Sequence, residues 1–233
     1  MSIATEIARL QTAKEDIKTA IETRGVPVPS GDLLDSYADF ILEIPDRYEI
    51  LEYIQSDGTF YIPTDILLTS SMWWDYKFQL TTAPGGQNQH IFSGVSYRTA
   101  QIGSSGSFYV RRGDKNGGSS NAVLINSGHT FAIGEDRTVV CFKDGDTIYT
   151  DGTANRTLAA VDLPTDTISA WFFSVNHSSD ANTFGARGKL YYMKVGTGNN
   201  LLYNFIPAKR NSDNNVGLLE IVNNRFYPSV SVS

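Results

Sequence analysis

Met72-Trp-Trp-Asp-Tyr-Lys-Phe-Gln-Leu80 is the stretch that decides the fold. Apolar residues occupy every second position of it, namely Trp74, Tyr76, Phe78 and Leu80. Because side chains alternate between the two faces of a strand, this pattern predicts a β-strand with one face toward a core. Trp73 then lies on the opposite face beside Asp75, Lys77 and Gln79, and we expect its indole to be exposed.

Further strands follow at short spacing. Residues 138–142 and 147–150 flank Lys143-Asp-Gly-Asp146, and an Asp-Gly pair between two such runs is a strong hairpin signal. Residues 168–175 and 189–195 have the composition of additional strands. No helical pattern interrupts this region, so residues 46–233 are predicted to form a mainly β, antiparallel sandwich or jelly roll.

The first 45 residues have a different period. Residues 2–24 contain no Gly or Pro, and alternating spacings of four and three residues separate Ile3, Ile7, Leu10, Lys14, Ile17 and Ile21. This a/d seam predicts a helix that packs against other helices, and Lys14 is a polar interruption that fixes register or oligomeric state. The alternative is an amphipathic helix that lies on its own domain.

A second short helix is predicted over about residues 32–43. Gly25 and the prolines at 27 and 29 end the first helix, and Asp32 suits an N-cap. Two short helices bury little surface alone. We therefore expect residues 1–45 to form a helical arm that joins a homo-oligomer, most simply a trimer, or attaches the chain to another protein.

Composition excludes several classes of function. The formal net charge is −6 and the basic run Arg111-Arg112 is too short to change that, so nucleic acid is not an expected partner. No apolar run approaches the roughly 18 residues of a membrane helix, and the N-terminus has no secretory-signal pattern, so we expect synthesis in a cytoplasm and no membrane insertion. Cys141, the only cysteine, is predicted to be a buried, inert thiol.

The sequence also lacks the usual catalytic patterns, and we expect no enzymatic activity. A glycosidase on a sandwich needs two carboxylates about 5–10 Å apart. Glu49 and Glu52 have an odd spacing that places them on opposite faces of a strand, and Glu135-Asp136 fits an exposed turn. The three histidines are scattered, and no Gly-x-Ser-x-Gly or phosphate-loop pattern occurs.

Carbohydrate binding requires an exposed aromatic face and planar polar groups that bond sugar hydroxyls. Trp73 is the first candidate for this face, and nearby loops and strands could add Tyr97, Arg98, Tyr109, Arg111 and His177. The alternative for Trp73 is packing against the helical arm or a neighbouring subunit.

No cofactor is expected, with one alternative. Oxygen ligands in loops could hold Ca²⁺, and the candidates are Asp144, Asp146, Asp180 and Asn182. Asp and Asn also populate turns for backbone reasons alone, which is the simpler interpretation.

Several segments resemble known proteins. Residues 51–65 resemble the opening strand pair of concanavalin A-like (laminin-G-like) sandwich domains in phage and gut-bacterial surface proteins, and 188–195, 201–213 and 216–227 resemble the terminal strands of that family. Residues 3–21, with 28–30, are similar to N-terminal arms of phage tail and fibre proteins. The middle of the chain, 87–183, matches only in its strand pattern. The matching motifs place Gly58 and Gly217 at tight backbone positions and assign core layers to Tyr53, Phe60, Phe205 and Phe226.

The resemblance implies a bacteriophage virion surface protein, such as a tail-fibre, baseplate or head-fibre subunit. Its arm would contact copies of itself and other virion structural proteins, and its sandwich would attach to a host surface glycan. Two alternatives remain: a capsid or tail decoration protein without a ligand of its own, and a divergent polysaccharide hydrolase.

Overall fold

The computed structural model describes residues 3–23, 28–29, 31, 34–37, 39, 47–69, 71–85, 89–94, 98–112, 123–143, 147–157, 169–177, 180–182 and 185–231. The chain divides into two compact units, Met1–Arg47 and Tyr48–Ser233, which are considered separately below. In the part of the chain that the structure describes, no helix has both the length and the hydropathy needed to cross a membrane.

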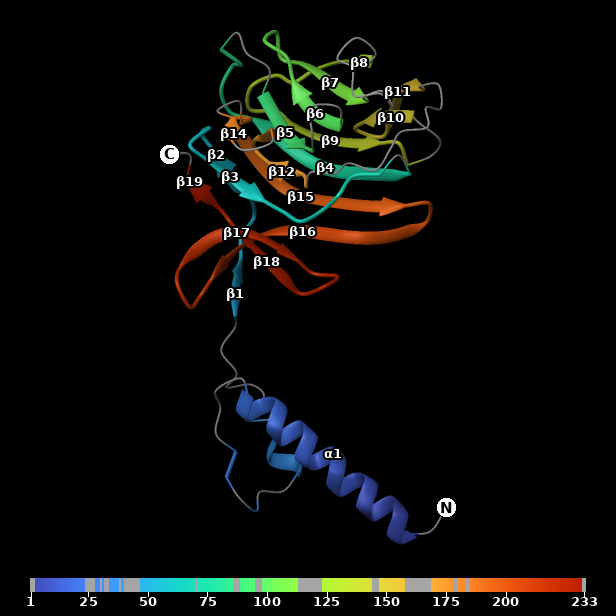
Figure 1. Ribbon diagram of the computed structural model, residues 1–233, viewed down its shortest axis with the longest axis vertical. Coiled ribbons are helices and arrows are strands. Elements are labelled where there is room, and N and C mark those ends of the chain that lie inside the picture. The colour runs from blue at the N-terminus through green and yellow to red at the C-terminus, as the bar shows by residue number, and fades with distance from the viewer. Residues whose placement is uncertain are drawn as a thin grey trace. The chain divides into compact units, whose positions relative to one another are not determined.

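The first unit contains α1 (Ile3–Thr23) and a short 3-10 helix, η1 (Leu34–Ser36) (Figure 1). The first predicted helix is therefore confirmed. In the range predicted for the second helix, Tyr37 and Asp39 are also helical, and the other residues of 32–43 lie outside the described ones. Within this unit Ile21, Val28 and Tyr37 form a small buried cluster.

The predicted seam of α1 is divided into a covered and an open part. Ile21 is 2% exposed, and the Lys14 ammonium lies 5.7 Å from the ring centroid of Tyr37. The other four seam residues are exposed, with exposed fractions of 82% for Ile3, 51% for Ile7, 57% for Leu10 and 39% for Ile17. The chain's own returning segment thus covers Ile21 and contacts Lys14, and it leaves the other four seam positions exposed.

The second unit is an antiparallel β-sandwich, as predicted. Among the described residues, one sheet has ten strands. Its spatial order is β11 (Thr153–Thr157), β10 (Thr147–Thr150), β9 (Asp136–Cys141), β4 (Met72–Leu80), β15 (Gly188–Thr197), β16 (Asn200–Arg210), β17 (Asn215–Glu220) and β18 (Arg225–Pro228). Two more strands pair outside this path, β1 (Tyr48–Ile50) with β16 and β2 (Ile54–Ser56) with β15. The predicted hairpin is confirmed by the pairing of β9 with β10.

The other sheet has seven described strands. Their order is β19 (Val230–Ser231), β3 (Phe60–Pro63), β12 (Trp171–Phe172), β5 (Gln89–Ser93), β6 (Arg98–Ile102), β7 (Ser107–Arg112) and β8 (Val123–Thr130). A separate pair is formed by β13 (Val175–His177) and β14 (Asp180–Asn182). The strands predicted over 168–175 and 189–195 correspond to β12, β13 and β15.

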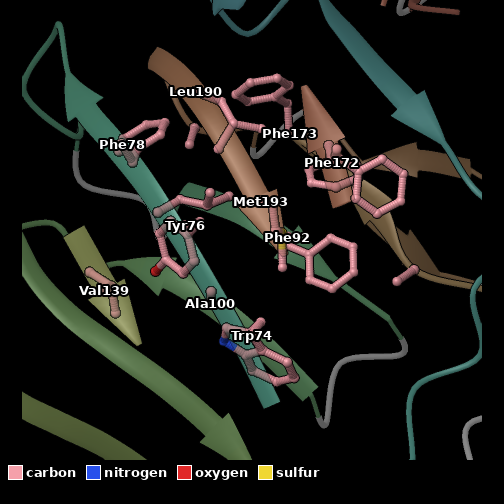
Figure 2. Packing of buried hydrophobic residues seen from close by; sticks show 14 of the residues in the cluster. Trp74, Tyr76, Phe78, Phe92, Ala100, Val139, Phe172, Phe173, Leu190 and Met193 are labelled. Atoms are coloured by element: carbon pink, nitrogen blue, oxygen red, sulfur yellow. The ribbon is translucent and has the colours of Figure 1, made fainter. Parts of the chain in front are cut away.

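The core lies between the two sheets and follows the alternation of β4. Trp74, Tyr76, Phe78 and Leu80 are each at most 2% exposed. The rings of Trp74 and of Phe92, which belongs to the opposite sheet, pack in an edge-to-face arrangement with their centroids 6.2 Å apart. Phe92 in turn contacts Phe172 (Figure 2). Cys141 is also fully buried, as predicted, and burial raises the pKa of its thiol.

Two of the four predicted core aromatic residues lie elsewhere. Phe205 is fully buried and Phe60 packs against the core, as predicted. Tyr53 and Phe226 are instead half-buried on the outer face of the ten-stranded sheet, where Tyr53 contacts Tyr191 and Phe226 stacks on Tyr48. Phe226 alternates with the core residue Tyr227 along β18, and the alternation places it outward.

Candidate functional site

The outer face of the seven-stranded sheet carries a stacked aromatic pair. Ile62 on β3 and Phe172 on β12 are paired in register and point into the core. Their neighbours Tyr61 and Trp171 therefore point outward. Their rings stack with centroids 4.6 Å apart and an interplanar angle of 19°, and both side chains are half-buried.

Backbone contacts fix the position of Trp171. β12 lies between β3 and β5, with Trp171 opposite Pro63 on one side and Ser93 on the other. The residue before it, Ala170, donates its N–H to the Ile66 carbonyl at 2.8 Å and accepts a hydrogen bond from the Thr64 hydroxyl at 2.5 Å. This short strand is thus held on both sides, and the indole has a defined place on the sheet.

Polar side chains continue the same face across the sheet. Gln101 lies between the core residues Ala100 and Ile102, so it points outward, and it pairs in register with His90 and Tyr109. Gln101 is 3% exposed, whereas His90 and Tyr109 are half-buried. Ser93, opposite Trp171, is fully buried and donates to the Gly94 carbonyl at 3.0 Å. Amide, hydroxyl and imidazole groups therefore extend from the aromatic pair.

The described strands of this sheet contain no Asp or Glu, although the whole chain has 25 acidic residues. The same strands include Arg98, Arg111 and Arg112. A pair of catalytic carboxylates has no position on the strands of this sheet.

The outer face of the ten-stranded sheet has a different character. Lys77 bonds Asp136 at 2.7 Å and lies over the Tyr191 ring, and the Tyr191 hydroxyl donates to the same carboxylate at 2.9 Å. The hydrogen bond from Lys77 lowers the pKa of Asp136, and burial together with that carboxylate raises the pKa of Tyr191 to about 12. Lys189 covers the Tyr53 ring at 4.2 Å. These groups satisfy one another, so this face is the weaker candidate for a ligand.

The expectation that Trp73 is exposed is wrong. Trp73 is 5% exposed, and its indole N–H donates to the Gly198 carbonyl at 2.8 Å. The ring lies directly over Gly196, and the Lys143 ammonium lies 5.0 Å from the ring centroid. Trp73 does point away from the core, as the alternation predicts, but a glycine on the neighbouring strand lets the ring lie flat on the sheet. Its role is therefore packing within its own sheet.

The structure describes some of the remaining predicted binding residues completely, some only as backbone, and one not at all. Tyr109 lies on the outer face of the seven-stranded sheet. Arg111 is in register with Thr99 on that sheet, Arg98 pairs with Arg112, and His177 pairs with Asp180. The side chains of Arg98, Arg111 and His177, and all of Tyr97, lie outside the described residues.

The calcium candidates are only partly described. Asp144 and Asp146 lie outside the described residues, and Asp180 and Asn182 are described only as backbone of β14. Across the described residues, no group of three or more His, Cys, Asp or Glu side chains is arranged to hold a metal ion.

Sequence reasoning missed Tyr61 and Trp171. The signal was present, because each alternates with a core residue on a short strand. The sequence does not reveal that β3 and β12 pair, since 106 residues separate Thr64 from Ala170. Only the fold brings the two rings together.

The fold and the site define an antiparallel β-sandwich unit with an aromatic outer face, preceded by a helical unit. No protein-family model matches the chain, and no curated protein matches it significantly. Among solved structures, it is similar to a mutant of NanB sialidase from Streptococcus pneumoniae, at 15% identity and a TM-score of 0.48, over 64% of this chain and 26% of the sialidase chain. The chain therefore spans about a quarter of that protein's length.

Two further solved structures are similar. One is the Ruminococcus gnavus IT-sialidase CBM40 bound to alpha2,3 sialyllactose, at 12% identity and a TM-score of 0.45, over 66% of this chain and 93% of that chain. The other is a heptameric SAP-like pentraxin from Limulus polyphemus, at 11% identity and a TM-score of 0.41, over 63% of this chain and 73% of that chain.

Proposed function

We propose that this chain is a non-enzymatic carbohydrate-binding protein of a bacteriophage virion surface, and that sugar binds on the outer face of the seven-stranded sheet. The observation that carries the proposal is the stacked pair of Tyr61 and Trp171. The helical unit would join copies of the chain and dock onto other virion proteins, while the sandwich contacts the host glycan.

The chemistry of this face fits a sugar. One side of a pyranose ring is largely C–H, and it packs against an aromatic face, while its hydroxyls need fixed donors and acceptors. The Trp171 indole already stacks on Tyr61, so little side-chain entropy is lost when a sugar ring stacks on it. Gln101 and Ser93 are buried beside this platform, and His90 and Tyr109 extend it. The half-buried imidazole of His90 and hydroxyl of Tyr109 can bond sugar hydroxyls, whereas Gln101 and Ser93 are too deeply buried to reach them.

The same face argues against hydrolysis. Retaining and inverting glycosidases both require two carboxyl groups across the scissile bond. The described strands of this sheet provide none. Binding without turnover is therefore the function that this face supports.

The virion setting rests on the sequence resemblance of the arm and of the terminal strands. The exposed seam residues Ile3, Ile7 and Leu10 support an arm that packs against other helices. A single shallow sugar site binds weakly, and several copies on one particle would supply avidity. We propose a trimer on the virion surface, assembled after synthesis in the host bacterial cytoplasm.

The test is binding of the full chain to an array of polysaccharides from candidate gut bacteria. Tyr61→Ala and Trp171→Ala should each weaken binding by about tenfold or more, because each removes part of the stacking platform. Tyr53→Ala is the matched control, since it removes a half-buried tyrosine from the opposite outer face. All variants need an unchanged unfolding midpoint for the comparison to hold.

Three other outcomes are informative. Equal binding by wild type and Trp171→Ala would place the ligand elsewhere on the chain. Absence of binding to every glycan would instead favour a decoration protein without its own ligand. Release of reducing sugar would contradict the non-enzymatic assignment.

A further inference from the structure

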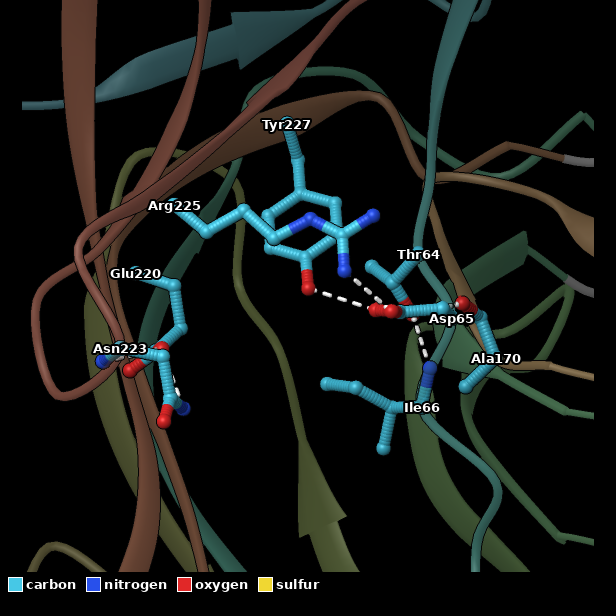
Figure 3. Close-up of polar contacts among 8 residues, drawn as sticks. All are labelled: Thr64, Asp65, Ile66, Ala170, Glu220, Asn223, Arg225 and Tyr227. Carbon is cyan, nitrogen blue, oxygen red and sulfur yellow. Dashed lines mark hydrogen bonds and ion pairs between the residues drawn. The ribbon is translucent and has the colours of Figure 1, made fainter.

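A closed set of hydrogen bonds joins the segment after β3 to the residue before β12. The Thr64 hydroxyl donates to the Ala170 carbonyl at 2.5 Å and accepts from the Ile66 N–H at 3.2 Å (Figure 3). The Ala170 N–H in turn donates to the Ile66 carbonyl at 2.8 Å. Thr64, Ile66 and Ala170 are all buried, so these bonds are shielded from water. Both main-chain groups of Ala170 are thus bound by residues 64–66.

These bonds hold the two strands that carry the aromatic pair. Tyr61 lies on β3, three residues before Thr64, and Trp171 directly follows Ala170. β12 has only two residues, so its ladders with β3 and β5 consist of two pairs each. A ladder this short holds its strand weakly, and the bonds at Ala170 add to it. They therefore contribute to the stacking of the two rings, whose centroids lie 4.6 Å apart.

Asp65 links the same segment to the opposite sheet. It lies between Thr64 and Ile66 in the chain. Its carboxylate accepts a hydrogen bond from the Tyr227 hydroxyl at 2.6 Å and pairs with Arg225 (Figure 3). Both partners belong to β18. A strand of the ten-stranded sheet thus helps to hold the segment that binds the backbone next to Trp171.

We propose that Thr64 and Asp65 are positioning residues of the carbohydrate site, and that they act on Trp171 through the backbone of Ala170. This inference rests on the proposed function of the outer face of the seven-stranded sheet. Neither residue needs to touch the sugar. A site binds best when its groups are held near their bound positions before the ligand arrives. Loss of this support should therefore lower affinity without removing a contact to the ligand.

A purely structural role for these bonds makes a different prediction. Loss of any buried hydrogen bond lowers the stability of the sandwich. Thr150 of β10 is a matched case in the other sheet, because it is 1% exposed and its hydroxyl and the Asn155 side chain form a hydrogen bond of 2.7 Å. A structural role predicts equal effects of Thr64→Val and Thr150→Val on glycan binding. A positioning role predicts that only Thr64→Val weakens it.

The first experiment measures binding by the full chain at a temperature at which every variant is folded. The probe is a set of soluble oligosaccharides released from a polysaccharide that wild type binds on the array, and isothermal titration gives the affinity. Thr64→Val should weaken binding by about five- to tenfold, because it removes the hydroxyl that holds Ala170. Thr64→Ser keeps this hydroxyl and should stay within about twofold of wild type, as should the control Thr150→Val.

Near-ultraviolet circular dichroism reports the position of the indole without a ligand. The difference between the spectra of wild type and Trp171→Phe defines the band of Trp171. Thr64→Val should reduce this band, whereas Thr64→Ser and Thr150→Val should leave it unchanged. An unchanged band in Thr64→Val would overturn the positioning role of the hydroxyl.

The link through Asp65 is tested by separate variants. Asp65→Ala and Tyr227→Phe should each weaken binding by about threefold. Because both break the same hydrogen bond, their combination should differ from either single variant by less than about twofold. Glu49→Ala is the matched control, since Glu49 is a 53% exposed carboxylate that pairs with Lys209 of the ten-stranded sheet. If Thr64→Val does not fold, these variants still test the proposal.

The outcomes separate this inference from the proposed function. If Trp171→Ala weakens binding while Thr64→Val and Asp65→Ala do not, the positioning role is wrong and the proposed function stands. If only one of these two variants weakens binding, the other residue has no positioning role. Equal losses in Thr64→Val and Thr150→Val also overturn the proposal. If wild type binds no glycan, or if Trp171→Ala has no effect, the proposed site itself fails.

Discussion

The phenolic hydroxyl of Tyr227 donates a hydrogen bond of 2.6 Å to Oδ1 of Asp65 (Figure 3). Tyr227 belongs to β18 of the ten-stranded sheet, and Asp65 follows β3 of the seven-stranded sheet. Arg225 binds the other carboxylate oxygen. This carboxylate therefore ties the two sheets together one residue from Thr64, whose hydroxyl holds the backbone beside Trp171.

Asp65 should make the stability of the sandwich depend on acidic pH. The hydrogen bond from Tyr227 lowers its pKa in the folded state below the usual 3.8. The carboxylate therefore contributes its full stabilisation above the unfolded-state pKa of 3.8. It loses this stabilisation as the pH falls through the folded-state pKa. Because Asp65 is 56% exposed, we expect its carboxylate to contribute only about 0.5–1 kcal/mol to the free energy of unfolding. Asp65→Asn should be less stable than wild type at pH 6, and the difference should shrink toward pH 2.

Urea unfolding followed by tryptophan fluorescence measures this effect, since Trp73, Trp74 and Trp171 all lie in the sandwich. Glu52→Gln, an exposed carboxylate on the same unit, is the control and should show no such change. A constant difference between Asp65→Asn and wild type from pH 2 to pH 6 would contradict the assignment.

Glu220 is predicted to be the most sensitive carboxylate of the sandwich. It is 1% exposed and accepts hydrogen bonds of 2.8–2.9 Å from the N–H groups of Asn204, Val222 and Asn223 and from the Asn223 side chain. Glu220→Leu leaves these buried donors without an acceptor and should cost about 2–3 kcal/mol. Glu135→Leu, at an exposed turn, is the control. Equal unfolding free energies for the two variants would show that the Glu220 contacts contribute nothing.

The strand pattern of the sandwich could be predicted from the sequence where alternation is strong. β4 has five buried apolar residues at every second position, from Met72 to Leu80, and the Asp-Gly signal correctly predicted the pairing of β9 and β10. The same rule placed Trp73 on the outer face. It could not show that the ring is buried there, because burial depends on Gly196 of a strand that is more than 100 residues away.

The candidate site was harder to predict for a related reason. Short strands such as β12, with two residues, give almost no periodic signal. Tyr61 and Trp171 become a pair only through the pairing of β3 with β12. Tyr109 was predicted from its type and neighbourhood, but the bond from Thr64 to Ala170 comes only from the pairing of distant segments. Local pattern thus indicates the face of a side chain, and long-range pairing decides its partners.

Gly196 should be intolerant of any side chain. An added Cβ would lie 2.3 Å from Cζ2 of Trp73 and 2.4 Å from the Asn200 carbonyl oxygen. Because the second neighbour is backbone, rotation of the indole cannot relieve the clash. Gly196→Ala should therefore lower the unfolding free energy by about 1–3 kcal/mol. Gly85→Ala is the control, since a Cβ there meets no atom within 4 Å. Urea unfolding that is identical for both variants would argue against this tight packing.

The division of the α1 seam predicts different effects for its exposed residues and for its buried residue. Ile7 and Leu10 are 51% and 57% exposed, whereas Ile21 is 2% exposed against Val28 and Tyr37. Replacing Ile7 and Leu10 together with Ser should abolish association and leave the helical circular dichroism signal largely intact. Ile21→Ala should instead weaken that signal, because it removes the buried anchor of the unit at a cost of about 2 kcal/mol or more.

Sedimentation equilibrium of the full chain measures the association directly. Wild type should have three times the chain mass of 25.7 kDa, and the variant with Ser at positions 7 and 10 should have the mass of one chain. The sandwich variant Tyr53→Ala should keep the wild-type mass, since it leaves the seam unchanged. A wild-type mass of one chain at all concentrations would mean that the exposed seam does not pack against other copies of this chain.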